Sequence, residues 1–357
     1  MFYLHHKKII IFFICLIFLC FCLFSQPTYH FSNLLVYFYD KNSIKCYRYS
    51  DPTLTDISFL DIRKGKSIFF HETSCNSHIN GKISITSREA CAVESAALLN
   101  PNLDVYLLYT SPGIFKFEGT ESDRFLQALL SYENIEINHL DYEKYTRGTP
   151  LEKLYSEGNI EASQYAMSHA SDVLRYLTLW KYGGIYLDLD IVVIKSLENL
   201  PPNFSGCESK ENVAAGIIGF QPEKTDNGHK LVEECIMDLK HNFSGTQWGN
   251  NGPGVVTRLV KKHCKVKQIK EAFNRRCDDF KVFSPEYFYA IPWQSWKEYF
   301  EDKSLDKVMN ATKKSYIIHV WNKHSNSLKL SLDSKSAYST FAKKYCPKVY
   351  EQCNSNF

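Results

Sequence analysis

The sequence predicts an α/β fold with a mainly parallel central sheet, preceded by one N-terminal transmembrane helix. From Lys66 onward, short runs of β-forming residues alternate with amphipathic helical stretches, as expected when crossover helices join parallel strands. A separate apolar run lies near the N-terminus. No clean linker and no internal repeat divides the rest of the 357 residues, so we expect one large domain.

The predicted elements of the first half alternate regularly. In chain order they are a strand at Ser67–His71, a helix at Arg88–Leu99, a strand at Asp104–Tyr109, a helix at Thr120–Ser131 and a strand at Ile135–Leu140. A further helix is expected to begin at Ser171, a good N-cap, and to end at Tyr182, where Gly183 closes it. The strand that follows is expected to cover Ile185–Ile194.

The N-terminal apolar run covers the 16 residues from Ile9 to Phe24 and follows Lys7 and Lys8. Its length suits a thin secretory-pathway bilayer. A cleaved signal peptide is the alternative, but the small-residue cleavage pattern is missing. By the positive-inside rule we expect a cytoplasmic tail at 1–8, a signal-anchor at 9–24, a stem at 25–64 and a luminal body at 65–357.

Charge and cysteine usage agree with a luminal body. The net charge of +3 is nearly neutral, and charges of both signs are interspersed, so we expect no nucleic-acid partner. Nine cysteines outside the apolar run lack paired CxxC motifs, which favours disulfides over zinc. Because nine is odd, at least one is free or pairs between chains. Short separation alone suggests Cys75–Cys91 and Cys264–Cys277. Three sequons predict N-glycosylation at Asn203, Asn242 and Asn310.

The segment Gly183–Lys195 carries the most informative motif, Asp188-Leu-Asp190. On a strand, alternation would place both carboxylates on one face. Two carboxylates facing one way suit a divalent cation, whose coordination shell a diphosphate can complete. Such a pair also arises by chance at a solvated strand end, so the motif needs support from its surroundings.

That support comes from residues expected at the same edge of the sheet. Ligands of open α/β sheets bind beyond the carboxyl ends of the strands. Glu72 and Thr73 follow the first strand, and Asp172 and Arg175 share one face of the preceding helix. A local ion pair would also explain the Asp172–Arg175 spacing. Their convergence with the Asp-x-Asp motif nevertheless favours a nucleotide-sugar site.

Several blocks of the sequence resemble a known enzyme family. Ser171–Arg175 and Trp180–Asp190 together resemble the sugar-binding DxD region of the alpha-1,4-glycosyltransferase family, and within it the branch of lactosylceramide 4-alpha-galactosyltransferases. Further blocks resemble this family in the same order, at Phe69–Ser74, Cys91–Ala97, Trp248–Pro253 with Thr257 and Arg258, Tyr287–Phe300 and Ile318–Lys323. One DxD motif would be weakly specific, whereas the ordered series is highly specific.

The resemblance implies a retaining, metal-dependent enzyme with a GT-A type fold, anchored in the Golgi membrane as a type II protein. Residues 65–200 would bind the donor, and residues 201–357 would form the acceptor side. Mn²⁺ and the UDP diphosphate would be held by Asp188, Asp190 and His319. The catalytic carboxylates would be Asp172 and Asp190. The other implied contacts are Glu72, Thr73, Arg175, Tyr186 and Gly216 for the donor, and Trp248, Asn251, Gly252 and Trp321 for the acceptor.

The implied reaction transfers galactose from UDP-galactose to a glycosphingolipid such as lactosylceramide. One departure bears on the donor, because Ala214-Ala215-Gly216 stands where the family pattern has Asn-Gly, with Asn212 nearby. UDP-N-acetylgalactosamine or UDP-N-acetylglucosamine therefore remain alternative donors, on glycolipid or glycoprotein acceptors. A non-catalytic Golgi sugar-binding protein and a homodimer also remain open. For His319, a satisfied strand histidine is the alternative to a donor-site role. For Trp293 and Trp296, packing is favoured over a sugar-binding surface.

Overall fold

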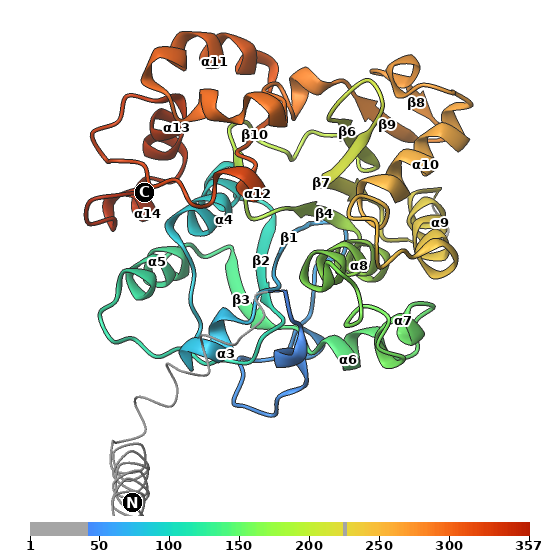
Figure 1. Cartoon of the computed structure of the whole chain (residues 1–357), viewed down its shortest axis with the longest axis horizontal. Helices are drawn as coiled ribbons and strands as arrows, with labels where there is room; N and C mark the ends of the chain where they lie inside the picture. Colours follow the sequence, from blue (N-terminus) through green and yellow to red (C-terminus); the bar gives the residue numbers. More distant parts are fainter. Residues whose placement is uncertain (1–41, 224–226) are drawn as a thin grey trace, which may run out of the picture. The chain divides into compact units, whose positions relative to one another are not determined.

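A sheet with strand order β3-β2-β1-β4-β7-β6-β9-β8 forms the centre of the protein (Figure 1). The computed structural model describes residues 42–223 and 227–357. The predicted tail and signal-anchor lie outside these residues. Within the described part, no helix is long and apolar enough to cross a membrane.

The first four strands of the sheet order run parallel to one another. They are β1 (Ser67–Glu72), β2 (Asp104–Tyr109), β3 (Ile135–His139) and β4 (Gly184–Leu187). Every residue of β1 is buried, as expected for a strand covered on both faces. The predicted α/β class with a mainly parallel sheet is thereby confirmed.

The second part of the sheet is mixed. Its strands are β6 (Phe204–Cys207), β7 (Val213–Phe220), β8 (Arg276–Cys277) and β9 (Phe280–Phe283). Strand β7 runs antiparallel to both β4 and β6, while β6 and β9 are parallel. Because β7 hydrogen-bonds directly to β4, the C-terminal half of the chain shares one sheet with the N-terminal half.

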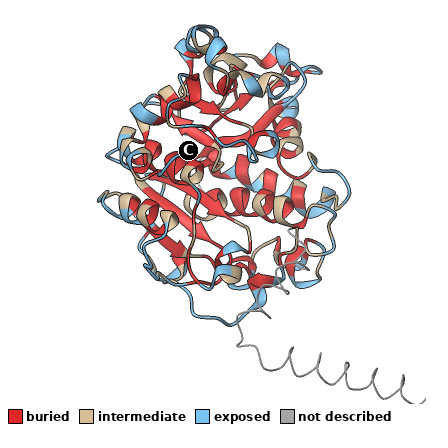
Figure 2. Cartoon of the chain, turned by 60° about the vertical axis from the view of Figure 1, so that its left-hand side comes forward, coloured by how far each residue is buried: buried red, intermediate tan, exposed pale blue. Residues whose placement is uncertain are grey.

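Helices cover both faces of the sheet (Figure 1). On one side lie α4 (Ser87–Leu99), α5 (Glu121–Leu130), α13 (Ala337–Tyr345) and α14 (Pro347–Glu351); on the other lie α8 (Ala166–Tyr182), α9 (Asn227–Asn242) and α10 (Pro253–Cys264). Capping boxes start α4 at Thr86 and α5 at Thr120, as their sequences favour. Figure 2 shows the buried residues concentrated in the sheet and on the inward faces of these helices.

Short helices complete the chain. They are α3 (Asn76–Asn80), α6 (Tyr142–Thr146), α7 (Glu152–Ser156), α11 (Leu305–Ala311) and α12 (Asn322–Ser325). Short 3₁₀ helices lie at Lys45–Arg48, Ile57–Phe59, Ile269–Ala272, Pro285–Tyr287, Trp293–Tyr299, Asp302–Ser304 and Thr312–Lys314.

The folded body begins earlier than the sequence suggested. Residues from Asn42 onward belong to the same compact unit as the rest of the body. Within the segment expected to be stem, Ile57 is fully buried and Cys46 is disulfide-bonded to Cys75. The described part of this segment, residues 42–64, shows no sustained period because short 3₁₀ turns alternate there with irregular chain.

The helix before the Asp-x-Asp motif is longer than predicted. Helix α8 begins at Ala166, so Ser171 lies inside it rather than at its N-cap. The expected end is confirmed, because Gly183 takes a φ of 62° and closes the helix. A Cβ on Gly184 would overlap the carbonyl oxygen of Ser67, so only glycine lets β4 approach β1 at this point.

The predicted strand Ile185–Ile194 is two strands. Strand β4 ends at Leu187, and β5 (Ile191–Val193) pairs antiparallel with β10 (Ile317–His319) in a separate two-stranded sheet. Between them, Asp188 and Asp190 lie in a turn closed by the Ile191 N–H, which donates to the Asp188 carbonyl at 3.1 Å. The expected one-face strand geometry of the two aspartates is therefore wrong.

One of the two guessed disulfides is correct. Cys264–Cys277 is present, but Cys75 pairs with Cys46 and Cys91 with Cys346. The Cys75–Cys91 prediction failed because short separation says nothing about which distant segment packs nearby. Among the described residues, Cys207, Cys235 and Cys353 are free and buried, in keeping with an odd number of cysteines.

The three sequons differ in accessibility. Asn242 and Asn310 are exposed. Asn203 is completely buried, and its amide nitrogen donates to Gln221 at 3.1 Å and to Asp279 at 3.2 Å. A glycan on that nitrogen would have to displace these partners and leave the core, so the burial of Asn203 argues against glycosylation there.

Candidate functional site

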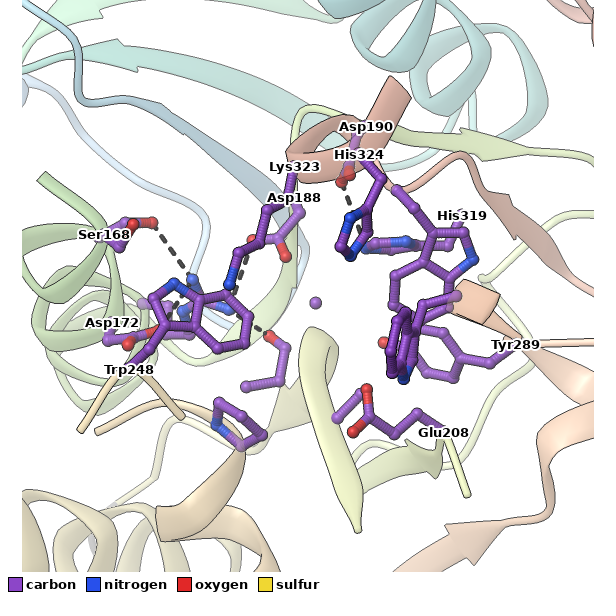
Figure 3. Close-up of a pocket in the computed structure, with 18 of the residues that line it drawn as sticks. Ser168, Asp172, Asp188, Asp190, Glu208, Trp248, Tyr289, His319, Lys323 and His324 are labelled. Carbon is purple, nitrogen blue, oxygen red and sulfur yellow. Dashed lines mark hydrogen bonds and ion pairs between the residues drawn. The ribbon is translucent and has the colours of Figure 1, made fainter. Parts of the chain in front are cut away.

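A pocket of about 550 Å³ opens beyond the carboxyl ends of β1 and β4 (Figure 3). Its walls come from α8, from the chain after β4, from β7 and the turn before it, from the loop before α10, and from β10 with α12. The predicted residues that line it are Thr73, Asp172, Arg175, Asp188, Asp190, Gly216, Trp248, His319 and Trp321. Segments separated by almost 250 positions thus meet at one sheet edge, as the convergence argument predicted.

Two carboxylates and one imidazole form the group that could hold a metal ion. Ligand atoms of Asp188, Asp190 and His319 all lie within 4.8 Å of one another. The Nε2 atom of His319 lies 3.3 Å from Asp190 Oδ1. Strand pairing explains this approach, because His319 on β10 is opposite Ile191, the residue that follows Asp190.

Backbone and side-chain hydrogen bonds orient both carboxylates. Asp188 Oδ1 accepts from the Tyr186 hydroxyl at 2.7 Å and lies 3.3 Å from Arg175 Nη1, while Oδ2 faces the Gly216 Cα. Asp190 Oδ2 accepts from the Asn322 N–H at 2.8 Å. One oxygen of each carboxylate is thereby held by the protein, while Asp188 Oδ2 and Asp190 Oδ1 face the group.

The donor set fits a divalent cation. Two carboxylates and one imidazole are suitable ligands for Mn²⁺, whereas soft metal ions prefer thiolate ligands. Burial raises the pKa of Asp190, with the nearby Asp188 charge adding to the effect and His319 opposing it. Two carboxylates in such a place repel each other until a cation enters.

Arg175 ties the helix wall to this group. It is buried, and its guanidinium donates to the Ala215 carbonyl at 2.8 Å and to the Ser171 hydroxyl at 3.2 Å, and pairs with Asp172 at 3.1 Å. The predicted Asp172–Arg175 ion pair is thus present and also reaches Asp188. Burial acts to lower the pKa of Arg175, but Asp188 and the other neighbours outweigh it and raise the pKa.

Asp172 is held away from water. Burial raises its pKa to about 7, with Arg175 acting against the rise and Asp188 adding to it. A Cβ on Gly252 would overlap the Asp172 carboxylate, so that glycine is needed for the loop before α10 to pack on the helix. Asp172 lines the pocket, and Arg175 is the main positive charge that balances its carboxylate.

Strand β7 forms a floor of small residues. Ala214, Ala215 and Gly216 all line the pocket, at the place where the resemblance implied an Asn-Gly pair. Asn212 is exposed and is not part of the pocket lining. The floor therefore offers methyl groups and backbone, with no side-chain amide.

Aromatic side chains surround the mouth of the pocket. Trp321 takes a φ of 57° and donates from its indole nitrogen to the Ile291 carbonyl at 3.0 Å. This left-handed residue turns the chain from β10 into α12, which places the Asn322 N–H on Asp190. The Lys323 ammonium lies 3.5 Å from the centre of the Trp248 ring, and Trp293 stacks on His324 at 5.4 Å.

Several predicted site residues lie outside the pocket lining. Glu72 is buried and accepts from the Ser74 N–H at 2.9 Å, and burial raises its pKa to about 8. Asn251 is fully buried and binds the backbone of Ser244, so it shapes the loop rather than the pocket. Gly252 packs on Asp172 from behind, and Tyr186 acts through its hydroxyl on Asp188.

Sequence reasoning missed other lining residues. Met167 and Ser168 belong to the first turn of α8, which was not predicted. Glu208 lies in the turn after β6, and Tyr289 sits within a recognised block without an assigned role. The Tyr289 hydroxyl accepts from the Ile217 N–H at 3.2 Å. Only the recognised block around Tyr289 offered a sequence signal for any of these.

Comparison with known proteins accounts for most of the described chain. Residues 86–205 match the model of the glycosyltransferase sugar-binding region containing the DXD motif, and residues 224–353 match the alpha 1,4-glycosyltransferase conserved region. Among solved structures, the galactosyltransferase LgtC in complex with donor and acceptor sugar analogs is 14% identical over 80% of this chain and 95% of that chain, with a TM-score of 0.36.

Named relatives are more similar in sequence. Lactosylceramide 4-alpha-galactosyltransferase of Rattus norvegicus is 33% identical over 89% of this chain and 86% of the relative. The enzyme of that name in Homo sapiens is 34% identical over 80% and 76%. The alpha-1,4-N-acetylglucosaminyltransferase of Homo sapiens is 29% identical over 73% and 74%. The chain therefore belongs to the alpha-1,4-glycosyltransferase family with a DXD sugar-binding region, and it is a glycosyltransferase.

Proposed function

We propose that the protein is a retaining transferase with a GT-A type fold that moves galactose from UDP-galactose, in α-1,4 linkage, to the terminal galactose of a glycolipid such as lactosylceramide. The observation that carries the proposal is the Asp188–Asp190–His319 group beside Arg175 in one pocket. The chain's 33% identity to a lactosylceramide 4-alpha-galactosyltransferase over most of both lengths supports the choice of sugar and acceptor.

Asp188, Asp190 and His319 would hold Mn²⁺, which when bound neutralises charge on the departing diphosphate. The protein's own residues prepare the surroundings for that charge. Tyr186 and Arg175 fix one oxygen of Asp188, and the Asn322 N–H fixes one oxygen of Asp190. The remaining oxygens need no reorganisation to face a cation, which is the condition for strong electrostatic stabilisation.

Helix α8 would hold the sugar end of the donor. Asp172 and Ser171 both line the pocket. The Asp172 carboxylate would accept hydrogen bonds from hydroxyl groups of a bound hexose, and the Ser171 hydroxyl would donate one. Thr73 at the end of β1 lies on the same wall. The Arg175 charge favours the nearby phosphate, while its contacts with Asp172 and Ala215 keep the guanidinium in place.

Retention is assigned to same-face attack. The acceptor O4 forms a bond to the anomeric carbon while the bond from that carbon to the UDP oxygen breaks, and the O4 proton passes to the departing phosphate. Asp172 is engaged with Arg175 and Asp188 with Tyr186, so we assign both to electrostatic support and positioning rather than to a covalent intermediate. A sugar adduct on either carboxylate, detected by mass spectrometry, would refute this assignment.

A UDP-N-acetylhexosamine is the second candidate donor. Ala214 and Ala215 line the floor of the pocket, where the resemblance implies an Asn-Gly pair, and their short side chains would leave room for an N-acetyl group. One relative is named an alpha-1,4-N-acetylglucosaminyltransferase. Pockets for hexose and N-acetylhexosamine can differ by few contacts, and the acceptor could then be a glycolipid or a glycoprotein.

The setting proposed for this reaction is the Golgi membrane. The three disulfides fit an oxidising lumen, and the apolar run at 9–24 would serve as a type II signal-anchor. A glycolipid acceptor would then lie in the same membrane as the anchor. We keep association as a homodimer as a further proposal, to be tested by analytical ultracentrifugation of the full-length protein.

The test uses full-length protein in detergent with Mn²⁺, lactosylceramide and a panel of UDP-sugars. We expect transfer from UDP-galactose, and loss of transfer in Asp190→Ala. Preference for an N-acetylhexosamine donor would select the second candidate. A folded protein that neither transfers nor hydrolyses any UDP-sugar would contradict the proposal and favour a non-catalytic Golgi sugar-binding protein.

A further inference from the structure

Glu208 is a carboxylate on the pocket wall that the proposed reaction does not use. It lies in the turn between β6 and β7, directly after Cys207, and it lines the pocket. Figure 3 shows its carboxylate pointing into the pocket beside Tyr289, on the opposite side from Trp248. The residue is partly buried, so the carboxylate has given up some of its water without leaving the cavity.

The protein supplies little to balance this carboxylate. Within residues 42–223 and 227–357, Glu208 forms no ion pair with a lysine or arginine, and it is not part of the Asp188–Asp190–His319 group. Burial raises the pKa of Glu208, whereas His319 and the Asn212 amide favour the charged form. A partly buried acid in this position still has lone pairs to offer to a ligand.

The negative charge of Glu208 restricts the kind of ligand group that can bind next to it. A diphosphate would be repelled by a carboxylate, and the positive residue suited to phosphate, Arg175, extends from α8 on the helix wall. Glu208 comes instead from the turn before β7, next to the aromatic residues of the C-terminal half. The group it contacts should therefore be neutral and rich in hydrogen-bond donors, which describes the hydroxyls of a sugar.

The surfaces around Glu208 also suit a sugar ring. The floor of Ala214, Ala215 and Gly216 is flat and small, and Tyr289 and Trp293 line the same pocket. Trp293 stacks on His324 but is 47% exposed, so part of its indole surface can contact the C–H groups of a hexose. Apolar faces combined with a few placed polar groups are the usual composition of a small-molecule subsite.

We propose that Glu208 binds hydroxyl groups of the acceptor's terminal sugar and thereby helps to select the acceptor. The proposal rests on the proposed transferase function and deepens it by placing an acceptor contact on the β6–β7 turn. It also replaces the predicted acceptor role of Asn251, whose amide is used up inside its own loop.

The test measures acceptor binding apart from catalysis. Full-length protein with UDP and Mn²⁺ is titrated with lactose, a soluble β-galactoside, and binding is followed by saturation-transfer NMR. Glu208→Gln keeps the shape and removes the charge, and Glu208→Asp keeps the charge but withdraws it by one methylene. The matched control is Glu211→Gln, which changes an exposed residue of the same turn. UDP affinity and thermal unfolding are measured for every variant.

We expect both Glu208 variants to bind lactose about tenfold more weakly, because a hydrogen bond to a charged group is worth roughly that factor. UDP affinity and the Glu211→Gln control should remain within about twofold of the wild type. In transfer assays the acceptor KM should rise more than kcat falls.

Three results would overturn the inference: unchanged lactose affinity in both folded variants, a loss of UDP affinity in Glu208→Gln, or no lactose binding by UDP-loaded wild type. Failure of the proposed function would look different from failure of this inference. In that case the wild-type protein would still bind lactose through Glu208 but would transfer no sugar to it.

Discussion

Gly216 is the residue on which the geometry of the metal-ligand group depends most directly. Its φ lies outside the left-handed region, so Gly216→Ala imposes no backbone strain. An added Cβ would lie 2.9 Å from Asp188 Oδ2, 3.2 Å from the Tyr289 hydroxyl and 3.4 Å from His319 Nε2. The substitution therefore places one methyl group between two proposed metal ligands while leaving the strand intact.

The size of the effect follows from these distances. Ordinary van der Waals contact begins at 3.4 Å, so Asp188 Oδ2 must retreat by about half an ångström. Metal–ligand distances tolerate only about 0.2 Å, and disturbances of ligand orientation typically cost 10–100-fold in metal affinity. We expect Gly216→Ala to weaken Mn²⁺ binding in the presence of UDP by about that factor.

The assay is calorimetric titration of full-length protein with Mn²⁺ at saturating UDP, beside thermal unfolding. Gly245→Ala is the matched control, because its added Cβ would meet Ser163 only at 3.5 Å or more. It should bind Mn²⁺ like the wild type. A folded Gly216→Ala protein with unchanged Mn²⁺ affinity would refute the assignment of Asp188 and His319 to one metal site.

Three further results are expected. Burial raises the pKa of Glu72 from its ordinary value of 4.5 to about 8, so the folded state keeps a proton that the unfolded chain loses. The free energy of unfolding should therefore fall from about pH 4.5 to 8, and Glu72→Gln should flatten that fall in urea titrations. The disulfide Cys91–Cys346 closes a separation of 255 residues, so replacing both cysteines by serine should cost about 4–5 kcal/mol in urea unfolding, and an unchanged midpoint would contradict its structural role. Asn203→Gln should leave glycan mass unchanged, whereas Asn242→Gln should lose one glycan by intact mass spectrometry.

The parts of the fold with local signals were predictable. Strands of buried β-formers and the capping boxes at Thr86 and Thr120 lie where the sequence places them. The start of α8 was not predictable, because Tyr165 makes no side-chain cap and the first turn carries no acidic residue. Helix α8 begins there because Ala166, His169 and Ala170 are buried in the core, which is a property of the tertiary structure.

The break between β4 and β5 had no sequence signal. Apolar residues continue on both sides of Asp188 and Asp190, so a single strand was the natural prediction. The break is set by contacts distant in sequence: Asp188 N–H donates to the Gly216 carbonyl at 2.9 Å, and β5 pairs with β10. Asp188, Asp190 and His319 nevertheless lie together, with ligand atoms within 4.8 Å of one another, because the contacts that break the strand also bring β10 beside the motif.

For other residues, a sequence motif predicted a role that the burial of the side chain does not support. Asn203 and Asn251 each satisfied a pattern, yet both amides serve the protein's own backbone and core. Glu208 satisfied no pattern and lies in the pocket. Sequence patterns report which residues occur together, whereas solvent access and the pairing of distant segments decide which of them can meet a ligand.

The most direct test of the account is anomalous diffraction from crystals of the protein grown with Mn²⁺ and UDP. We expect a manganese peak within coordination distance of Asp188 or Asp190 and of His319, with the diphosphate on the same ion. A manganese peak elsewhere, or UDP bound away from the pocket, would contradict the proposed donor site.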